Sequence, residues 1–528
     1  MNKSLLALSI ATTMLLCGPA SHAADVVPVN FDDPGEGYND TTPATPAGGN
    51  PGTTLGEQRR IVAQFAADLW GSVLVSDQPV FVGAQFNPLG PNVLGSAGAT
   101  FVFSDFAPGI VADTWYSSAL ADAISGTDLE PGFIDINSQF SSDFDFYYGL
   151  DGNTPAGQVS FLDVVMHEFG HGLGFQNFEN EAAGTFLANR QDIYSVFTFD
   201  NTTGKYWTQM TVPERRASAL NYGKVVFDGA RATLGAGLTL DPRTAFTVTA
   251  PAALAGEYEY GTASFGPAIT PANFSGTVIL GADGIGADND GCEPLANPAA
   301  VAGNIVLLDR GACTFVIKAL NAQAAGATGM VIADTAAGTP PPALGGTDPA
   351  ITIPAIRITL ADGNAFKANL LAQVGLVVDP DKLQGADDAG HPRLFMPDPV
   401  QGGSSGSHYD TALAPNALME PAINDSLDAS LNLDISANLL QDTGWTLNGG
   451  NARIGNCDTG VDVVDDAGII VGANVQATSN LCESRARNRG HYQRCMAQYA
   501  DRLEASGLVS GAQADAITSC AAKSGKGG

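Results

Sequence analysis

The sequence contains few basic residues, and this limits the partners that the chain can bind. Lysine and arginine together number 24 against 55 aspartates and glutamates, which gives a formal net charge of -31 at pH 7. Phosphate backbones and anionic membrane surfaces are bound by clusters of positive charge. The composition therefore argues against a nucleic-acid partner, and the acidity is typical of a solvated, mutually repelling surface on an exported protein.

Long apolar runs are also missing. Beyond the N-terminal segment, no stretch reaches the roughly 18 consecutive apolar residues that a membrane-spanning helix requires, so we expect no membrane span. The first 23 residues, MNKSLLALSIATTMLLCGPASHA, combine a lysine, an apolar run and small residues near Ala23. This pattern predicts a cleaved signal peptide. We therefore expect a secreted protein, extracellular or periplasmic, whose mature chain starts near Ala24.

Cysteine is scarce, and no two cysteines have the C-x-x-C spacing of a zinc or redox site. Without Cys17 of the predicted signal, six remain, an even number that predicts disulfides in an exported chain. Four of them lie in the C-terminal region. There we expect Cys495 with Cys520 and Cys457 with Cys482, although four cysteines admit three connectivities. The six disulfide candidates are Cys292, Cys313, Cys457, Cys482, Cys495 and Cys520.

The chain is long enough for two to four domains, with 528 residues, 62 glycines and only 15% charged residues. Periodicity predicts a helix near residues 58–70, strands at 78–86 and 132–140, and an amphipathic helix that starts at Ser160. From about residue 225 the pattern changes to short β-like runs and an alanine-rich helical stretch. A helix is expected near 431–443, and two short helices joined near Gly507 complete the tail.

The predicted amphipathic helix carries the stretch HEFGHGLGF, which begins at His167. Histidines at i and i+4 project from one helix face and can take two sites of a zinc ion. Glu168, between His167 and His171, is placed to act as general base on a metal-activated water. Gly174 lets the chain leave the helix through a left-handed conformation. This extension makes the motif more specific than HExxH alone.

A third metal ligand is needed, because a catalytic zinc ion usually has three protein ligands and one open position. Asn177 stands where a compact motif has its third histidine, but a neutral amide oxygen is a weak zinc ligand. His408 has the best context, since it lies in GSSGSHYD and Met419 follows in NALMEP. The other candidates are Asp192, Asp200, His391 and, in the tail, His491, which we expect at the surface.

The combination of HEFGHGLGF, SHYD and NALMEP resembles the leishmanolysin-like metzincins, zinc peptidases whose third histidine lies far downstream and precedes a methionine turn. The resemblance covers roughly residues 30–450. It implies one catalytic Zn²⁺ bound by His167, His171 and His408, with Glu168 as general base and Met419 in the turn beneath the metal. It also implies that Asn177 is not a ligand.

The long segment between the second and third histidines also resembles a known module. GCEPL, GNIVLLDRGACTF, KALNAQAAGATGMVIAD and ITIPAIRITLADGNAFK are similar to a protease-associated (PA) domain. Within this module we expect a disulfide between Cys292 and Cys313. The resemblance implies that the module engages substrate or a partner, or restricts access to the active site. The acidic run 283–291 lacks the spacing and closing glutamate of an EF-hand, so calcium is unsupported there.

Together these patterns predict an α+β protein in which a β-rich α/β PA domain interrupts a metzincin-like zinc peptidase domain. The predicted function is a secreted zinc-dependent endopeptidase that cleaves extracellular proteins or peptides. Two alternatives stay open: a catalytically silent secreted binding or adhesion protein that retains the fold, and a zinc hydrolase of non-peptide substrates. The expected boundaries are 1–23 for the signal, 24–225 and 385–450 for the catalytic domain, 226–384 for the PA domain and 451–528 for the cysteine-containing helical tail.

Overall fold

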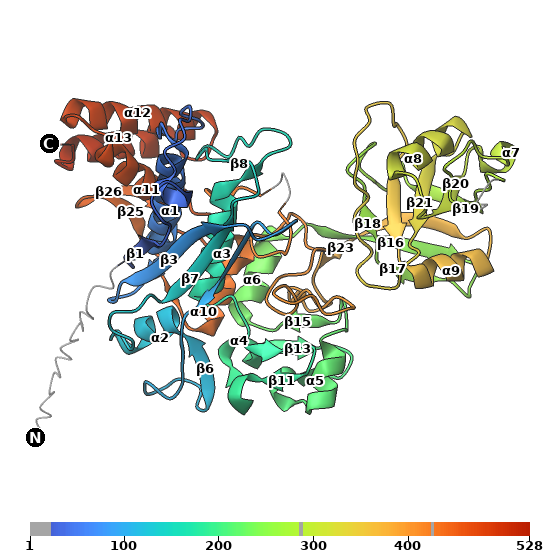
Figure 1. The fold of residues 1–528 in the computed structure, drawn as a ribbon, viewed down its shortest axis with the longest axis horizontal. Coiled ribbons are helices and arrows are strands. Elements are labelled where there is room, and N and C mark those ends of the chain that lie inside the picture. The colour runs from blue at the N-terminus through green and yellow to red at the C-terminus, as the bar shows by residue number, and fades with distance from the viewer. Residues whose placement is uncertain (1–22, 285–288, 424–426, 528) are drawn as a thin grey trace, which may run out of the picture.

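The structure is a computed structural model, and it describes residues 23–284, 289–423 and 427–527. The predicted signal peptide, including Cys17, therefore lies outside the described residues apart from Ala23. The chain forms two bodies (Figure 1). The first is built from both ends of the chain, and the second is a separate lobe formed by the middle of the chain. This is the mixed α/β organisation expected from the sequence.

The first body contains a four-stranded sheet in the order β1-β3-β7-β4. Strands β1, β3 and β7 are parallel, whereas β4 runs antiparallel to β7 at the edge. The strands predicted at 78–86 and 132–140 are confirmed as β3 and β7. The strand bounds are β1 Val26–Asn30, β3 Val80–Asn87, β4 Gly95–Ala99 and β7 Ile136–Ser141.

Two long helices pack against this sheet and against each other. Helix α1 (Leu55–Val73) begins where the Thr54 side chain accepts a hydrogen bond from the Glu57 amide. Helix α3 (Phe161–Leu173) begins in the same way at Ser160, and all of its residues are buried. The Trp70 indole of α1 donates to a carbonyl of α3, which fixes the two helices side by side. Both predicted helices are confirmed, but α3 has no exposed polar face, because its polar side is buried as well as its apolar side.

Helix α6 (Ala230–Thr239) belongs to the first body, although we expected residues 226–384 to form the inserted module. The α6 backbone donates to the carboxylate of Asp442 on α10 (Asp434–Thr443), and Gly235 lies against Asn438. The smaller elements of this body are β2 Leu74–Val75, β5 Val102–Phe103, β6 Thr114–Ser117, α2 Ser118–Ser125, β8 Phe146–Tyr147, β9 Val159–Ser160, β10 Glu179–Asn180, β11 Thr185–Phe186, β12 Gln191–Asp192, α4 Ile193–Val196, β13 Thr198–Asp200, β14 Lys205–Tyr206, α5 Val212–Ser218, β15 Val225–Phe227 and β24 Thr446–Leu447.

The second body is an eight-stranded sheet in the order β17-β16-β23-β19-β20-β21-β22-β18. Side chains of the central strand β20 alternate between two hydrophobic cores: Ile305 and Leu307 join one, and Val306 and Leu308 join the other. The bounds are β16 Pro242–Ala250, β17 Gly256–Tyr258, β18 Gly261–Thr262, β19 Ser275–Leu280, α7 Pro298–Val301, β20 Ile305–Asp309, α8 Phe315–Ala324, β21 Gly329–Ala333, β22 Ala355–Ile358, α9 Leu360–Ala368 and β23 Gln373–Leu383.

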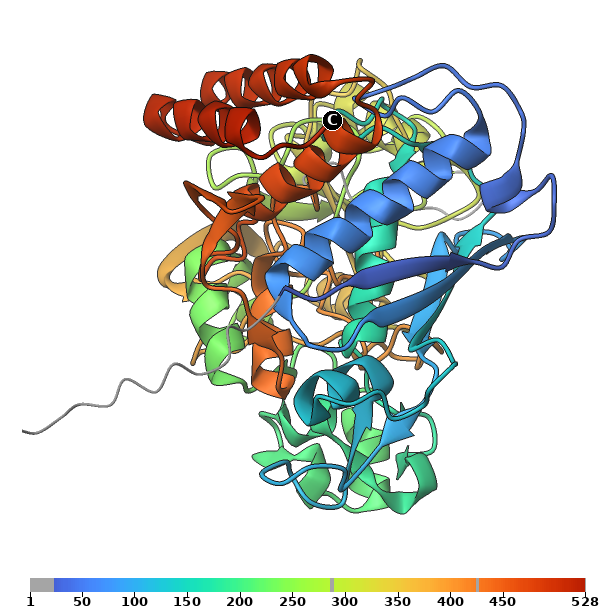
Figure 2. The ribbon, with the colours of Figure 1, turned by 90° about the vertical axis from the view of Figure 1, so that its left-hand side faces the viewer.

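The C-terminal region packs on α1. Helix α11 (Val471–Ser484) lies alongside α1, and the antiparallel pair α12 (Arg489–Ala505) and α13 (Gly511–Lys523) extends from its end (Figure 2). The two helices joined near Gly507 are therefore confirmed. A hairpin of β25 (Asn451–Ile454) and β26 (Cys457–Asp462) completes the region.

All six expected cysteines form disulfides, but two of the expected pairs are wrong. Cys292 pairs with Cys313, as expected. In the tail, Cys457 pairs with Cys520 and Cys482 with Cys495. The reason is the packing of α13 on β26, which brings the last cysteine to the hairpin rather than to α12. Among the described helices, none is long and apolar enough to cross a membrane.

The two tail disulfides should differ in their contribution to stability. Residues 457 and 520 are 63 positions apart, whereas 482 and 495 are 13 apart. A longer closed loop restricts the unfolded chain more, so replacing Cys457 and Cys520 with serine should cost about 4 kcal/mol, against about 3 kcal/mol for the other pair. Urea unfolding of the two double variants measures this difference. A larger loss from the Cys482 and Cys495 replacement would contradict it.

Candidate metal centre

Three histidine side chains meet at one point beside α3. The Nε2 atoms of His167 and His171 are 3.1 Å apart, and the Nε2 atom of His408 lies 3.2 Å from each of them. All three side chains are buried. Two of the histidines come from consecutive turns of α3, as the motif predicted, and the third comes from a loop more than 200 positions later in the sequence.

His408 reaches the other two histidines through a loop that is held by backbone pairing. The amide of Phe395 donates to the carbonyl of His408, and the amide of Gly406 donates back to the carbonyl of Phe395, both at 2.9 Å. Residue 394 also forms a β-bridge with Tyr409. The segment that follows the second body therefore holds the histidine loop against the first body.

Each histidine ring is oriented by a backbone carbonyl behind it. The Nδ1 atoms of His167, His171 and His408 lie 2.6, 2.8 and 2.9 Å from the carbonyl oxygens of Leu418, Phe175 and Ser404. A carbonyl oxygen only accepts, so each Nδ1 carries the proton and donates it. Each Nε2 then has a free lone pair. The short Nε2 separations are thus contacts between three acceptors, not hydrogen bonds.

This donor set fits a zinc ion. Nitrogen ligands at about 2.0–2.1 Å from a tetrahedral zinc ion are roughly 3.3 Å apart, close to the spacing of the three Nε2 atoms. Three buried acceptor atoms in mutual contact have no donor between them, and a cation at their centre satisfies all three lone pairs. The carbonyl behind each ring is the partner that metal-binding histidines usually have.

Burial also favours the neutral form of these histidines. Desolvation lowers the pKa of His167 to about 4, and desolvation together with the neighbouring His167 lowers the pKa of His171 to about 3. The pKa of His408 is likewise lowered, mainly by desolvation. The neutral form is the one that binds metal, so all three rings are ready to act as ligands at pH 7.

The histidines line a cleft of about 600 Å³, and Glu168 lies in the same cleft. Burial raises the pKa of the Glu168 carboxyl to about 8. A Cβ atom at Gly95 of the edge strand β4 would come within 2.6 Å of the Glu168 Oε1 atom. The carboxyl group is therefore enclosed between the helix that carries it and the edge of the sheet.

A turn containing Met419 lies beneath the histidines. A Cβ atom at Gly170 of α3 would come within 2.7 Å of the Met419 sulfur, so this glycine allows the methionine to pack closely under the helix. The Met419 carbonyl accepts from the amide of Tyr409, and the Leu418 amide donates to Asp434 at 2.5 Å. The turn thus contacts both histidine-bearing segments.

The other candidate ligands lie outside the three-histidine group of the described residues. The Asp192 carboxylate accepts from the amides of Phe178 and Ser195. The Asp200 carboxylate accepts from the amides of residues 202 and 203. His391 lies between Asp387 and Asp228, and His491 is exposed at the start of α12. Asn177 lines the cleft, where its amide nitrogen faces the Gly406 turn.

Several residues of the site carry no sequence signal. The carbonyls of Phe175, Ser404 and Leu418 act through backbone atoms, which any residue type provides. Gly95 lies in a stretch rich in glycine and proline, so nothing in the sequence distinguishes it from a glycine of an ordinary turn. Asp434 could have been noticed as an acidic residue at the start of the predicted helix near 431–443, but that position suggests only helix capping.

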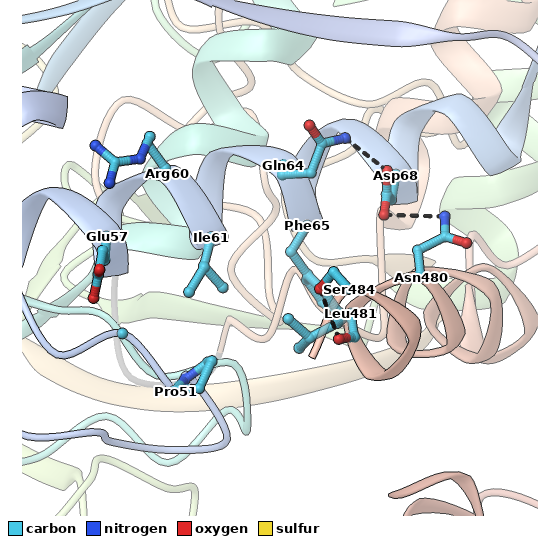
Figure 3. Close-up of a pocket in the computed structure, with 11 residues that line it drawn as sticks. Pro51, Glu57, Arg60, Ile61, Gln64, Phe65, Asp68, Asn480, Leu481 and Ser484 are labelled. Atoms are coloured by element: carbon cyan, nitrogen blue, oxygen red, sulfur yellow. Dashed lines mark hydrogen bonds between the residues drawn. The ribbon is translucent and has the colours of Figure 1, made fainter. Parts of the chain in front are cut away.

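A second hollow of about 670 Å³ lies between α1 and α11, and none of its residues belongs to the histidine cleft. Figure 3 shows Glu57 and Arg60 along the α1 side and Asn480 on the α11 side. The Asp68 carboxylate accepts from the side-chain amide of Gln64, one turn earlier on α1, and from that of Asn480 on α11. The bond from Asn480 joins the C-terminal region to the first body.

Comparison with known proteins identifies one part of the chain. Residues 274–366 match the family model of the PA domain, so the second body contains a PA domain. ER degradation-enhancing alpha-mannosidase-like protein 3 of Homo sapiens is 50% identical over 46 residues, which are 9% of this chain and 5% of that protein. The chain thus spans only a small part of this curated relative.

Two solved structures overlap with part of the chain. A zinc aminopeptidase from Bacillus subtilis is 23% identical, with 28% of this chain and 36% of that chain covered and a TM-score of 0.20. A peptidase M28 precursor from Shewanella amazonensis is 15% identical, with 32% and 43% covered and a TM-score of 0.17. The chain spans less than half of either structure, so we draw nothing from them about the histidine-bearing body.

Two glycines of the His408 loop allow a test of its geometry. Gly403 and Gly406 both have positive φ, but a Cβ atom at Gly406 would lie 2.3 Å from the Asn177 side chain, whereas Gly403 faces open space. Alanine at either position should cost about 1–2 kcal/mol of stability from backbone strain. Only Gly406→Ala should also displace His408 and weaken zinc binding, by roughly 10–100-fold.

Competition with a chromophoric chelator measures the zinc affinity of both variants. Gly403→Ala is the matched control, and Asn177→Ala combined with Gly406→Ala should restore much of the affinity by removing the obstructing amide. Equal zinc affinities of the two single variants would show that the loop does not position the ligand in this way.

Proposed function

We propose that the protein is a secreted zinc-dependent endopeptidase that hydrolyses peptide bonds of extracellular proteins. The observation that carries this proposal is the convergence of three neutral histidine Nε2 atoms, from His167, His171 and His408, beside the buried carboxyl of Glu168 in one cleft. Three nitrogen ligands leave the fourth position of a tetrahedral ion open, as catalytic zinc sites do.

Glu168 is the proposed general base. It follows His167 directly on α3, and it lines the cleft beside all three histidines. Zinc bound by the histidines would supply Lewis-acid polarisation of the peptide carbonyl and a lowered pKa for water. The positive charge of a bound zinc ion would favour the ionised form of Glu168, against the effect of burial. This carboxylate would accept a proton from the attacking water and deliver it to the leaving amine. A purely structural zinc site needs no such acid.

The position of the edge strand β4 favours an endopeptidase over an exopeptidase. β4 pairs with β7 on one side, and no strand of the described residues pairs with its other side. Gly95, Ser96 and Ala97 of β4 line the cleft. An unpaired strand edge can bind an extended peptide by backbone hydrogen bonds. A substrate bound along it would have chain on both sides of the cleaved bond.

The same features support membership of the leishmanolysin-like metzincins. The HExxHxxG stretch, the distant His408 and the turn with Met419 are the elements that this family combines. The PA domain, which lies between His171 and His408, would be an insertion in the catalytic domain, and we propose that it engages substrate or a partner. Three disulfides fit an oxidising, extracellular or periplasmic location.

Substitution of Glu168 with glutamine tests this function. The variant should keep about one zinc ion per chain, because the three ligands are unchanged. Cleavage should fall by about 10²–10⁴-fold, the usual contribution of a general base. The substrates are an unfolded protein and a fluorogenic peptide blocked at both ends, which an exopeptidase cannot process. Elemental analysis and initial rates provide the two readouts.

The matched control is Glu57→Gln in the hollow between α1 and α11. Glu57 accepts from the amide and hydroxyl of Thr53, and a glutamine oxygen can accept in the same way. This variant should keep full activity. If the zinc-loaded parent cleaves neither substrate, a silent binding protein is favoured. If it cleaves only esters or small amides, a hydrolase of non-peptide substrates is favoured.

A further inference from the structure

A second group of convergent ligand atoms lies in the first body, away from the histidines. It consists of Asp122 on α2, Glu130 in the loop after this helix, and Asp135 immediately before β7. One carboxylate oxygen of each lies within 4.8 Å of the other two. The exposed fractions of the three residues are 4% for Asp122, 8% for Glu130 and 4% for Asp135. Oxygens bound to one calcium ion at about 2.4 Å are at most roughly 4.8 Å apart, so the spacing suits a common ion.

The group has an excess of negative charge. The charged residues that act on these three carboxyls are the carboxyls themselves and Asp128, all of them acidic. Burial is the main cause that raises the pKa of both Glu130 and Asp135 to about 7, and the neighbouring carboxylates raise it further. Like charges in a buried site repel one another unless protons or a cation neutralise them.

Glu130 is the residue that points to a bound ion. Both of its carboxylate oxygens are buried and have no hydrogen-bond partner, and the residue as a whole is 8% exposed. The two aspartates, in contrast, each give one oxygen to the backbone: Asp122 accepts from the Leu129 amide and Asp135 from the Phe81 amide. A buried carboxylate without donors is costly and requires another partner.

We propose that Asp122, Glu130 and Asp135 bind one calcium ion. All three ligands are oxygen atoms, which hard cations prefer, whereas zinc favours the nitrogen ligands of the histidine cluster. Calcium takes six to eight oxygens, so two-oxygen binding by some carboxylates and water molecules would complete the shell. Asp128, on the same loop, is exposed and adds negative charge close to Glu130.

The ion would add one more connection between three segments of the first body. Helix α2 ends at Ser125, the loop carries Glu130, and β7 begins at residue 136. Ile136 packs against Gly172 at the end of α3, and β7 carries the edge strand β4 that borders the cleft. Calcium would therefore stabilise the sheet edge next to the histidine site without belonging to that site.

Another acidic group in the PA domain does not have the same properties. Asp283, Asp290 and Glu293 also lie close together, but the buried Lys318 amine faces them and donates to the Asp290 carbonyl. A cation from the protein is thus already present there. This group provides a comparison for the experiment.

Calorimetric titration of the zinc-loaded, full-length protein with calcium chloride tests the proposal. The parent should bind one calcium ion at this site, and calcium at about 100 times its dissociation constant should raise Tm by about 5 °C. Glu130→Gln should lower the calcium affinity at least about 10-fold and abolish the Tm increase. Its fold should persist, since the two carboxylate oxygens of Glu130 have no hydrogen-bond partner to lose and its backbone bond to the Phe133 amide is unchanged. Asp122→Asn, which can still accept from the Leu129 amide, should give the same loss.

Glu293→Gln is the matched control and should retain both the calcium affinity and the Tm increase of the parent. The proposal is overturned if the parent binds no calcium, or if Glu130→Gln binds it as tightly as the parent. A parent indifferent to calcium, together with a Glu130→Gln variant of higher Tm, would mean that the carboxyls share protons instead of a metal ion.

Discussion

The histidine centre depends on three backbone carbonyls that hold the proton of each ring on Nδ1. This constraint turns all three Nε2 lone pairs toward one point, where their separations of 3.1–3.2 Å leave no donor between them. The carbonyls come from the end of α3, the His408 loop and the Met419 turn. Each of these segments must therefore be in place before the site exists.

The position of the PA domain does not disturb this arrangement, because the two ends of the module meet. Its first strand, β16, runs antiparallel to its last strand, β23, and Pro242 pairs with Leu383. The chain thus leaves the first body and returns to it at neighbouring points. The segment after β23 then pairs with residues of the first body, such as Val226 with Arg393, and delivers His408. A long insertion between His171 and His408 is compatible with one compact histidine cluster for this reason.

The sequence contained strong local signals for the parts that form locally. The capping residue Ser160 and the apolar periodicity predicted helix α3, and the i, i+4 spacing of His167 and His171 placed both on one face of it. Alternating or continuous apolar runs predicted the PA strands, and residues 274–366 match the PA family. The identity of the third histidine needed the family pattern, because no local periodicity connects residues so distant.

Other features depend on long-range packing and were not predictable. The tail pairing of Cys457 with Cys520 follows from α13 lying on β26, which spacing does not reveal. Helix α6 looked like the start of the module, yet it packs on α10. The group of Asp122, Glu130 and Asp135 is spread over a helix, a loop and a strand start, so only the fold brings its carboxylates together.

The most direct test is the zinc content per chain of the purified protein and of its His408→Ala variant, measured by elemental analysis after dialysis at a fixed free zinc concentration. We expect about one zinc ion per chain in the parent and a large loss in a folded variant, since removal of a ligand costs more affinity than the roughly 10–100-fold of indirect changes. Full zinc retention by the folded variant would contradict the three-histidine centre.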